Sequence, residues 1–279
     1  MARTGLIILL ILIPISVSLQ AQKADTMIVE IDDIVVKENR IRLPYYEKPA
    51  AISIIRKEYS ELLPVSDLSD LLYLQASVDI RARGVNGVQN DLSIRGSSFD
   101  QVLVLVNGMK ISDPQTGHHS LNLPIDLDAI KNIEVYKGPT ARVFGQNAFA
   151  GAINIITGIP AYNEARSYIS AGDFGLVSGG AGISFGNIDF RNSLNISYSK
   201  SNGYKYNTDY KVGNLFYQSE ILNDKGRIEI IAGLSMREFG ANGFYASPDY
   251  KDQFEAITTS LASIAFIPEL KSDKINLSS

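Results

Sequence analysis

The chain has 279 residues, enough for one large domain or two of ordinary size, and 26 basic against 30 acidic residues give a formal net charge of −4. It contains no cysteine, which excludes a disulfide framework, a thiolate metal site and a cysteine nucleophile. No basic patch points to nucleic acid as a partner.

The N-terminal residues 1–21 are typical of a secretory signal peptide. Arg3 supplies a positive charge, Leu6 to Leu19 form an apolar stretch, and Ala21 is a small residue suited to cleavage. The apolar stretch is shorter than the roughly 20 residues that a membrane-spanning helix needs. We therefore expect export, and we expect any insertion into a membrane to use a β-barrel.

The segment 22–44 is polar and carries two short apolar triplets, Met27–Val29 and Ile34–Val36. It has too little apolar surface to fold alone, so we expect a flexible segment with a β-prone core. Such a core can add itself as a strand to the sheet edge of a partner. An ordinary edge strand of the following domain is the alternative.

Residues 45–158 predict an α+β domain, a small mixed sheet with one or two helices. A helix is expected to begin with Ser66 as its N-cap. Asn107 and Gly108 predict a tight hairpin, because both residue types tolerate positive φ. In the later part, a half-buried strand ends at the breaker Gly138-Pro139, and a buried strand follows a run of small residues. The expected strands are 51–56, 78–83, 92–95, 102–107, 132–136 and 152–157.

The longest irregular polar stretch of this domain, 112–124, contains Gln115 and the only two histidines, His118 and His119. Loops of this kind on a rigid scaffold tend to carry recognition. Neighbouring residues of an extended chain point in opposite directions, so the two histidines are poorly placed to bind one metal ion, and no third ligand is evident. We predict no metal site, and the histidines are either solvated or in contact with a ligand.

From residue 161 onward the sequence changes to long alternating strands. Leu194, Ile196 and Tyr198, for example, alternate with serine and asparagine. About ten residues of such alternation are typical of a strand in an outer-membrane β-barrel, with apolar side chains outward and polar ones inward. We expect six strands up to residue 267 and the beginning of a seventh at 274–279, with Phe216 as a violation of the pattern.

The connection 238–255 is long and rich in glycine, and it carries Phe244 and Tyr245. Aromatic side chains on adaptable loops offer contact area at low entropic cost. We therefore expect these two residues to contact a ligand.

Three stretches, in this order along the chain, resemble the plug domain of TonB-dependent outer-membrane receptors. They are residues 34–56, residues 91–113 with the sequence DLSIRGSSFDQVLVLVNGMKISD, and residues 133–157 with IEVYKGP and VFGQNAFAGAINIIT. The resemblance implies a plug inside a barrel of about 22 strands. We accordingly expect the larger part of the barrel to be missing after Ser279. The expected domains are a signal peptide at 1–21, a flexible segment at 22–44, the plug at 45–158 and the first barrel strands at 161–279.

The resemblance also implies a function, the import of a scarce nutrient such as an iron–siderophore complex or cobalamin, driven by TonB with ExbB and ExbD. A surface lipoprotein and the lipid of the outer membrane are further implied partners. The family's TonB box, its contact with TonB, fits Ile34, Val35, Val36 and Lys37 best, with the stretch Asp25–Val29 as a rival. By the same resemblance, Arg95 and Lys137 face barrel carboxylates, and the loop with Gln115, His118 and His119 reaches a ligand at the outer apex.

The sequence lacks hydrolase, zinc-protease and phosphate-loop motifs, and the cluster Gly180, Gly182 and Gly186 lies within an alternating strand. We therefore expect neither enzymatic activity nor a cofactor. The alternative to a transporter is an exported binding or signalling module that carries a plug but transports nothing.

Overall fold

The computed structural model describes residues 35–37, 42–44, 51–58, 62–63, 65–84, 87–113, 116–244 and 249–268. Its elements in chain order are β1 (Val35–Lys37), β2 (Arg42–Pro44), β3 (Ile52–Arg56), α3 (Leu68–Tyr73), β4 (Val78–Arg83), β5 (Gln89–Ile94), η3 (Phe99–Gln101), β6 (Val102–Val106), β7 (Met109–Ile111), η4 (Leu127–Ala129), β8 (Ile130–Lys137), α4 (Ala141–Phe144), β9 (Gly151–Thr157), β10 (Glu164–Gly172), η5 (Asp173–Gly175), β11 (Leu176–Gly186), β12 (Phe190–Ser201), β13 (Tyr210–Asn223), β14 (Gly226–Gly240) and β15 (Phe254–Pro268).

The plug is built on a five-stranded mixed sheet with the strand order β3-β8-β9-β6-β7. Strands β6 and β9 run parallel, and the other neighbours are antiparallel. Asn107 and Gly108 have φ of 50° and 82° in the turn between β6 and β7, as the hairpin prediction requires. The predicted α+β character of this part of the chain is confirmed.

The face of β8 that was expected to be exposed is buried. Glu134 is 3% exposed and Tyr136 is 1% exposed, so the prediction of a half-buried strand is wrong. Glu134 Oε2 accepts hydrogen bonds from Tyr136 Oη and from Asn154 Nδ2, each at 2.9 Å. Asn154 Oδ1 accepts the N–H of Gly108 at 2.9 Å. A buried polar network, rather than solvent, satisfies this face of the sheet.

Two boundaries in the plug also differ from the predictions. The N-cap of α3 is Asp67 and not Ser66, because the Asp67 side chain accepts the N–H of Asp70 at 3.0 Å. Ser66 instead donates its own N–H to Asp70 Oδ2 at 2.8 Å, so the two ends of this turn cap each other. Strand β5 begins and ends earlier than the predicted 92–95, since Gln89 to Asp91 already pair with β4.

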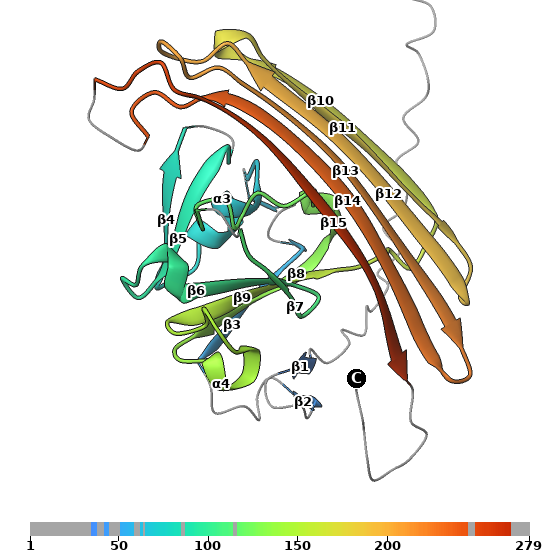
Figure 1. Cartoon of the computed structure of the whole chain (residues 1–279). Coiled ribbons are helices and arrows are strands. Elements are labelled where there is room, and N and C mark those ends of the chain that lie inside the picture. The colour runs from blue at the N-terminus through green and yellow to red at the C-terminus, as the bar shows by residue number, and fades with distance from the viewer. Residues whose placement is uncertain are drawn as a thin grey trace, which may run out of the picture. The chain divides into compact units, whose positions relative to one another are not determined.

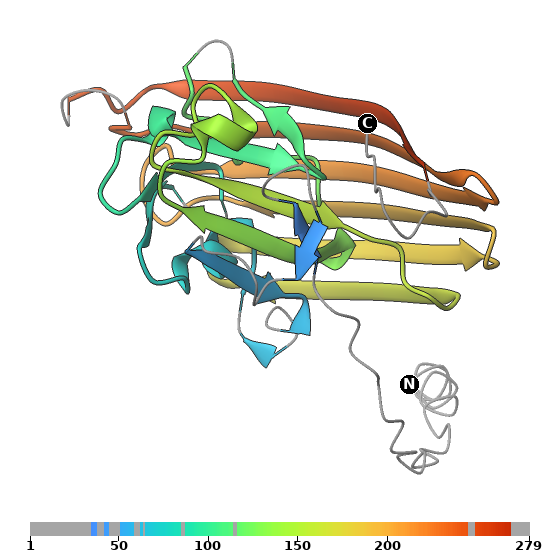
Figure 2. The ribbon, with the colours of Figure 1, turned by 90° about the horizontal axis from the view of Figure 1, so that it is seen from below.

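Strands β10 to β15 form a separate six-stranded sheet in which every strand pairs antiparallel with the next (Figures 1 and 2). The six predicted strands are confirmed, and the predicted seventh at 274–279 lies outside the described residues. This open antiparallel sheet is consistent with part of a barrel. Among the described residues, no helix is both long enough and apolar enough to cross a membrane.

The two faces of this sheet differ in chemistry. Its outer face carries a series of exposed apolar side chains, Ile169, Ile183, Leu194, Ile196, Tyr198, Leu215, Met236 and Ile264. Its inner face contacts the plug and is mostly polar. Phe216 breaks the alternation because it points to the inner face, where it is 1% exposed and packs against Ala129 of the plug. The violation of the barrel pattern is thus a contact with the plug.

Candidate functional site

The plug and the inner face of the sheet meet at an interface with an apolar side and a polar side. On the apolar side, Ala129 packs with Phe216 of β13 and Ile231 of β14. Leu261 of β15 packs against the plug core. Gly233 of β14 permits a close approach, because a Cβ added there would lie 2.7 Å from Pro124 Cγ. Strands β13 to β15 therefore hold the plug by direct apolar packing.

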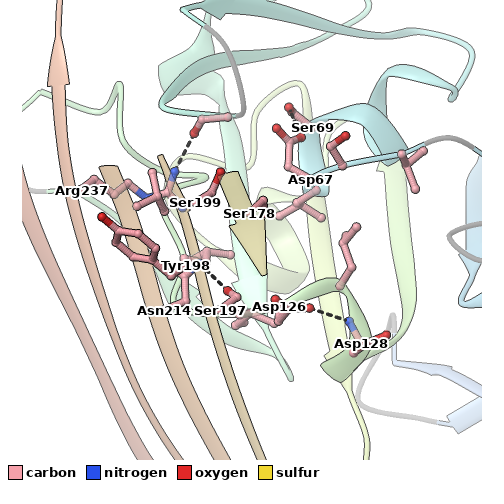
Figure 3. Close-up of a pocket in the computed structure, with 18 of the residues that line it drawn as sticks. Asp67, Ser69, Asp126, Asp128, Ser178, Ser197, Tyr198, Ser199, Asn214 and Arg237 are labelled. Carbon is pink, nitrogen blue, oxygen red and sulfur yellow. Dashed lines mark hydrogen bonds between the residues drawn. The ribbon is translucent and has the colours of Figure 1, made fainter. Parts of the chain in front are cut away.

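The polar side contains a cavity of about 460 Å³ between the plug and the sheet (Figure 3). Its polar lining comes from carboxylates of the plug and hydroxyls of β10 to β12, among them Asp67, Asp126, Asp128, Tyr168, Ser170, Ser178, Ser197 and Ser199. Asn214 of β13, Arg237 of β14 and several apolar side chains of the plug, such as Leu121, Leu123 and Ile125, also line it. Asp128 lies 3.6 Å from Arg166 of β10, and Asp126 is hydrogen-bonded to Ser197 of β12. Burial raises the pKa of Asp126, and its hydrogen bonds oppose this shift. Here a cavity, rather than direct packing, separates the plug from the sheet.

Arg237 of β14 links the two sides of the interface. Its Nη1 donates to the carbonyl oxygen of Gly87 at 2.6 Å, and its Nε donates to Ser235 Oγ at 3.3 Å. The Asp67 carboxylate lies beside the same turn, since a Cβ on Gly87 would be 2.7 Å from Asp67 Oδ2. A buried guanidinium needs such partners, because an unpaired buried charge is costly. The sequence analysis did not single out Arg237, although an inward-facing charge on a barrel strand is a signal of a contact with the plug.

The two histidines lie in a turn rather than in an extended chain, and they point to different partners. His118 Nδ1 lies 2.6 Å from Asp91 Oδ1, and Arg83 Nε donates to the other oxygen of Asp91 at 3.2 Å. His119 Nδ1 lies 3.1 Å from Asn122 Nδ2, and its Nε2 lies 3.7 Å from Glu255 of β15. Both side chains are largely buried, so the interpretation of solvated histidines is wrong. Their contact with a ligand stays a prediction.

Phe244 is buried rather than displayed on the surface. It is 8% exposed, its ring stacks on Phe239 at 5.9 Å, and it packs in one cluster with Val88 of the plug. A ligand could reach Phe244 only if the loop 241–253 moved. Tyr245 and Gln115 lie outside the described residues.

The described residues that were predicted to contact a ligand nevertheless lie near one another. Phe244 contacts the turn that follows Arg83, since a Cβ on Gly84 would lie 3.0 Å from its Cζ. Arg83 pairs with Asp91, which pairs with His118. Next in the chain, His119 approaches Glu255. The described residues of three segments that are far apart in the sequence, 83–91, 116–119 and 239–255, thus meet at one place.

Arg95 and Lys137, the predicted partners of barrel carboxylates, lie close together. Arg95 is exposed and has φ of 56°, a left-handed conformation that is uncommon for a side chain with a Cβ. Its Nη1 lies 3.9 Å from where a Cβ on Gly138 would be, and Gly138 follows Lys137 directly. The pairing with barrel carboxylates stays a prediction.

Three of the four TonB-box candidates form a strand. Val35 to Lys37 pair antiparallel with Arg42 to Pro44 in a two-stranded sheet, and Ile34 lies outside the described residues. The segment is therefore not an edge strand of the five-stranded plug sheet, which was the alternative. A two-stranded ladder of this kind is at best marginally stable in water.

The electrostatics of His119 give a pH prediction. Burial lowers its pKa, and the opposing effect of Glu255 is smaller. Since the folded-state pKa lies below the ordinary value, the folded loop favours neutral His119, and this stability is lost as the pH falls through the lowered pKa. We expect hydrogen exchange in residues 116–123, corrected for intrinsic rates, to be several-fold faster at about pH 5 than at about pH 7.5. His119→Gln should abolish this difference, and an equal difference in that variant would contradict the assignment.

Comparisons with known proteins agree with the fold. The family described as TonB-dependent Receptor Plug Domain matches residues 44–152. The vitamin B12 transporter BtuB of Vibrio vulnificus is 34% identical over 254 residues, which cover 88% of this chain and 40% of that protein. The chain thus spans less than half the length of this relative.

Two solved structures share the fold at low identity. The ferripyoverdine receptor of the outer membrane of Pseudomonas aeruginosa, bound to ferripyoverdine, has a TM-score of 0.63 at 16% identity and covers 74% of this chain and 28% of its own. A variant of the ferric enterobactin receptor PfeA from the same organism has a TM-score of 0.62 at 18% identity, with 85% and 40% covered. The plug match, the related transporter and the plug-and-strand architecture together show that the chain belongs to the outer-membrane family of TonB-dependent receptors.

Proposed function

We propose that the chain forms the plug and the first barrel strands of a receptor that imports a cobalamin-like or iron–siderophore ligand across the outer membrane, with energy from TonB, ExbB and ExbD. The observation that carries the proposal is the plug seated on the inner face of a sheet whose outer face is apolar. The apolar outer face of such a sheet suits contact with lipid. Its polar inner face can hold a plug that is able to move away during transport. The relationship to a vitamin B12 transporter over 88% of the chain supports cobalamin as the first ligand to test.

The convergence of the segments 83–91, 116–119 and 239–255 supports a ligand site at this end of the plug. Its side chains are already paired, as in Arg83–Asp91–His118, so the ligand would meet an ordered surface. Preorganised groups bind with less loss of conformational entropy. Phe244 would take part after movement of its loop.

The test is uptake of labelled cyanocobalamin and of several ferric siderophores by the bacterium, with and without the gene for this protein. Uptake of one ligand that requires both this protein and TonB supports the proposal. Binding at the surface without uptake would favour the binding or signalling module, and neither binding nor uptake of any of these ligands would contradict the proposal.

Deletion of Ile34 to Lys37 should lower uptake at least about tenfold and leave surface binding of the ligand unchanged, because the deletion removes a β-prone segment able to pair with TonB. Thr26 to Val29, an equally long stretch of the rival register, is the matched control. If its deletion abolishes uptake and the first deletion does not, the register of the TonB box is wrong.

A further inference from the structure

The inner face of the sheet is divided along its strands. Val212 and Phe216 of β13, Ile231 and Phe239 of β14 and Leu261 of β15 are apolar, and all of them belong to or pack on clusters that include plug residues. The inner face of β10 to β12 carries serines and a tyrosine around the cavity, and Val212 and Asn214 of β13 and Arg237 of β14 complete the side of the cavity formed by the sheet. Leu176, which packs beside Val88, is the main apolar exception there.

The two halves of the interface resist separation unequally. Burying apolar surface stabilises a contact by about 25 cal/mol per Å², and separating it exposes that surface to water. Polar contacts such as Asp126 with Ser197 exchange for contacts with water at a small net cost, about 1 kcal/mol for a typical hydrogen bond. The Asp128–Arg166 pair is more than a third exposed, so water weakens it further. The plug should therefore part from β10 to β12 before it parts from β13 to β15.

The cavity lies on the side where this separation is expected. Its volume of about 460 Å³ is that of a small-molecule site, and hydroxyls and carboxylates line it together with apolar side chains (Figure 3). Asn90 of the plug, 3% exposed, also lines it, and its Oδ1 has no hydrogen-bond partner among the described residues. Such an acceptor suits a donor group of a molecule that enters the cavity.

We infer that the transport passage opens along β10 to β12, through this cavity, and that it presents hydroxyls, carboxylates and the amides of Asn90 and Asn214 to the hydroxyl- and amide-bearing surface of the ligand while the plug stays packed on β13 to β15. The inference rests on the transport function proposed above. It assigns residues 125–128 as the part of the plug that moves, since they line the cavity, while Pro124 stays packed on Gly233 of β14.

Two cysteine pairs can distinguish the two sides, because the natural chain has no cysteine. Asp126→Cys with Ser197→Cys would tie the segment to β12. Pro124→Cys with Gly233→Cys would tie the adjoining residue, which does not move, to β14, where the two Cβ atoms would be 3.0 Å apart, so that a small shift reaches the roughly 3.8 Å of a disulfide. Ser184→Cys with Ser193→Cys, a directly opposed pair within the sheet, is the control for oxidation itself.

With labelled cyanocobalamin and ferric siderophores as probes, the oxidised Asp126–Ser197 tether should lower uptake at least about tenfold, reversibly on reduction, without affecting surface binding. The Pro124–Gly233 tether and the control should stay within about twofold of the reduced proteins. Uptake that is unaffected by the first tether, or blocked equally by the second, overturns the inference.

A second measurement does not depend on transport. In whole cells, Ser178→Cys should react with a charged methanethiosulfonate reagent at least about tenfold faster than Ile231→Cys, since thiol reactivity follows access to water. Equal rates, or a faster Ile231→Cys, overturn the inference even if the ligand is never identified. If no probe is taken up by the unaltered protein, the proposed function fails, and the labelling rates still decide which side is open.

Discussion

Replacing Asn154 with leucine is expected to lower the free energy of unfolding of the plug by about 3–5 kcal/mol. The substitution keeps the approximate volume of the side chain but removes a donor to Glu134 and the acceptor of the Gly108 N–H. A carboxylate that is 3% exposed is then left with fewer hydrogen bonds, and water cannot replace them.

Pulse proteolysis of the purified protein across a urea series would measure this loss, with a midpoint at least about 1 M lower than for the unaltered protein. Asn187→Leu is the matched control, because Asn187 Oδ1 accepts two backbone N–H groups at 2.9 Å in an exposed turn. Its cost should be about 1 kcal/mol or less. Equal midpoints for the two variants would show that the hydrogen bonds of the buried network contribute no more to stability than those of the exposed turn.

Replacing Phe216 with alanine is expected to weaken the packing between the plug and the sheet by about 3–5 kcal/mol. Phe216 is 1% exposed and contacts Ala129 together with Ile231, so truncation leaves a cavity at the apolar side of the interface. The strands themselves should still form, because the backbone ladder with β12 and β14 does not depend on this ring.

The effect would appear in cells as faster proteolysis of the plug and as sensitivity to a large antibiotic such as vancomycin. The neighbouring residue provides the control, since Leu215 lies on the outer face with 43% exposure. Leu215→Ala should leave both readouts near those of the unaltered protein. If it has the same effect as Phe216→Ala, the loss arises from the strand and not from the contact with the plug.

The periodicity of the sequence was sufficient to predict the strands, because alternation is a local property of the chain. Strands β11 to β15 follow from apolar and polar residues in turn, and the plug strands follow from short apolar runs between Gly, Pro and Asn-Gly breakers. Local sequence rules were less reliable for the residues at which helices and strands begin and end. Ser66 and Asp67 are both good N-cap residues, and only the hydrogen bond to Asp70 distinguishes them.

The contacts between the plug and the sheet could not be predicted in this way. Arg237 depends on the carbonyl oxygen of Gly87, 150 positions away in the chain. Phe244 was expected to contact a ligand because it lies in a long loop, yet Val88 and Phe239 cover it. Glu134 was assigned to a solvated face, since a single strand does not reveal that Asn154 lies opposite. In each case, contacts with residues far away in the chain decide whether the side chain is buried. The sequence pattern of a single element does not reveal these contacts.

The position of β3 in the sheet has a mechanical consequence. It is the first strand of the five-stranded sheet in the chain and also its edge, bonded to β8 alone over five residue pairs. Any tension applied to the chain ahead of residue 51 therefore reaches an edge strand with a single neighbour before it reaches the other strands of this sheet. Separating β3 from β8 breaks one ladder of backbone hydrogen bonds and leaves the pairing of β8, β9 and β6 intact. A modest force can therefore detach β3 before any force acts on the central strands.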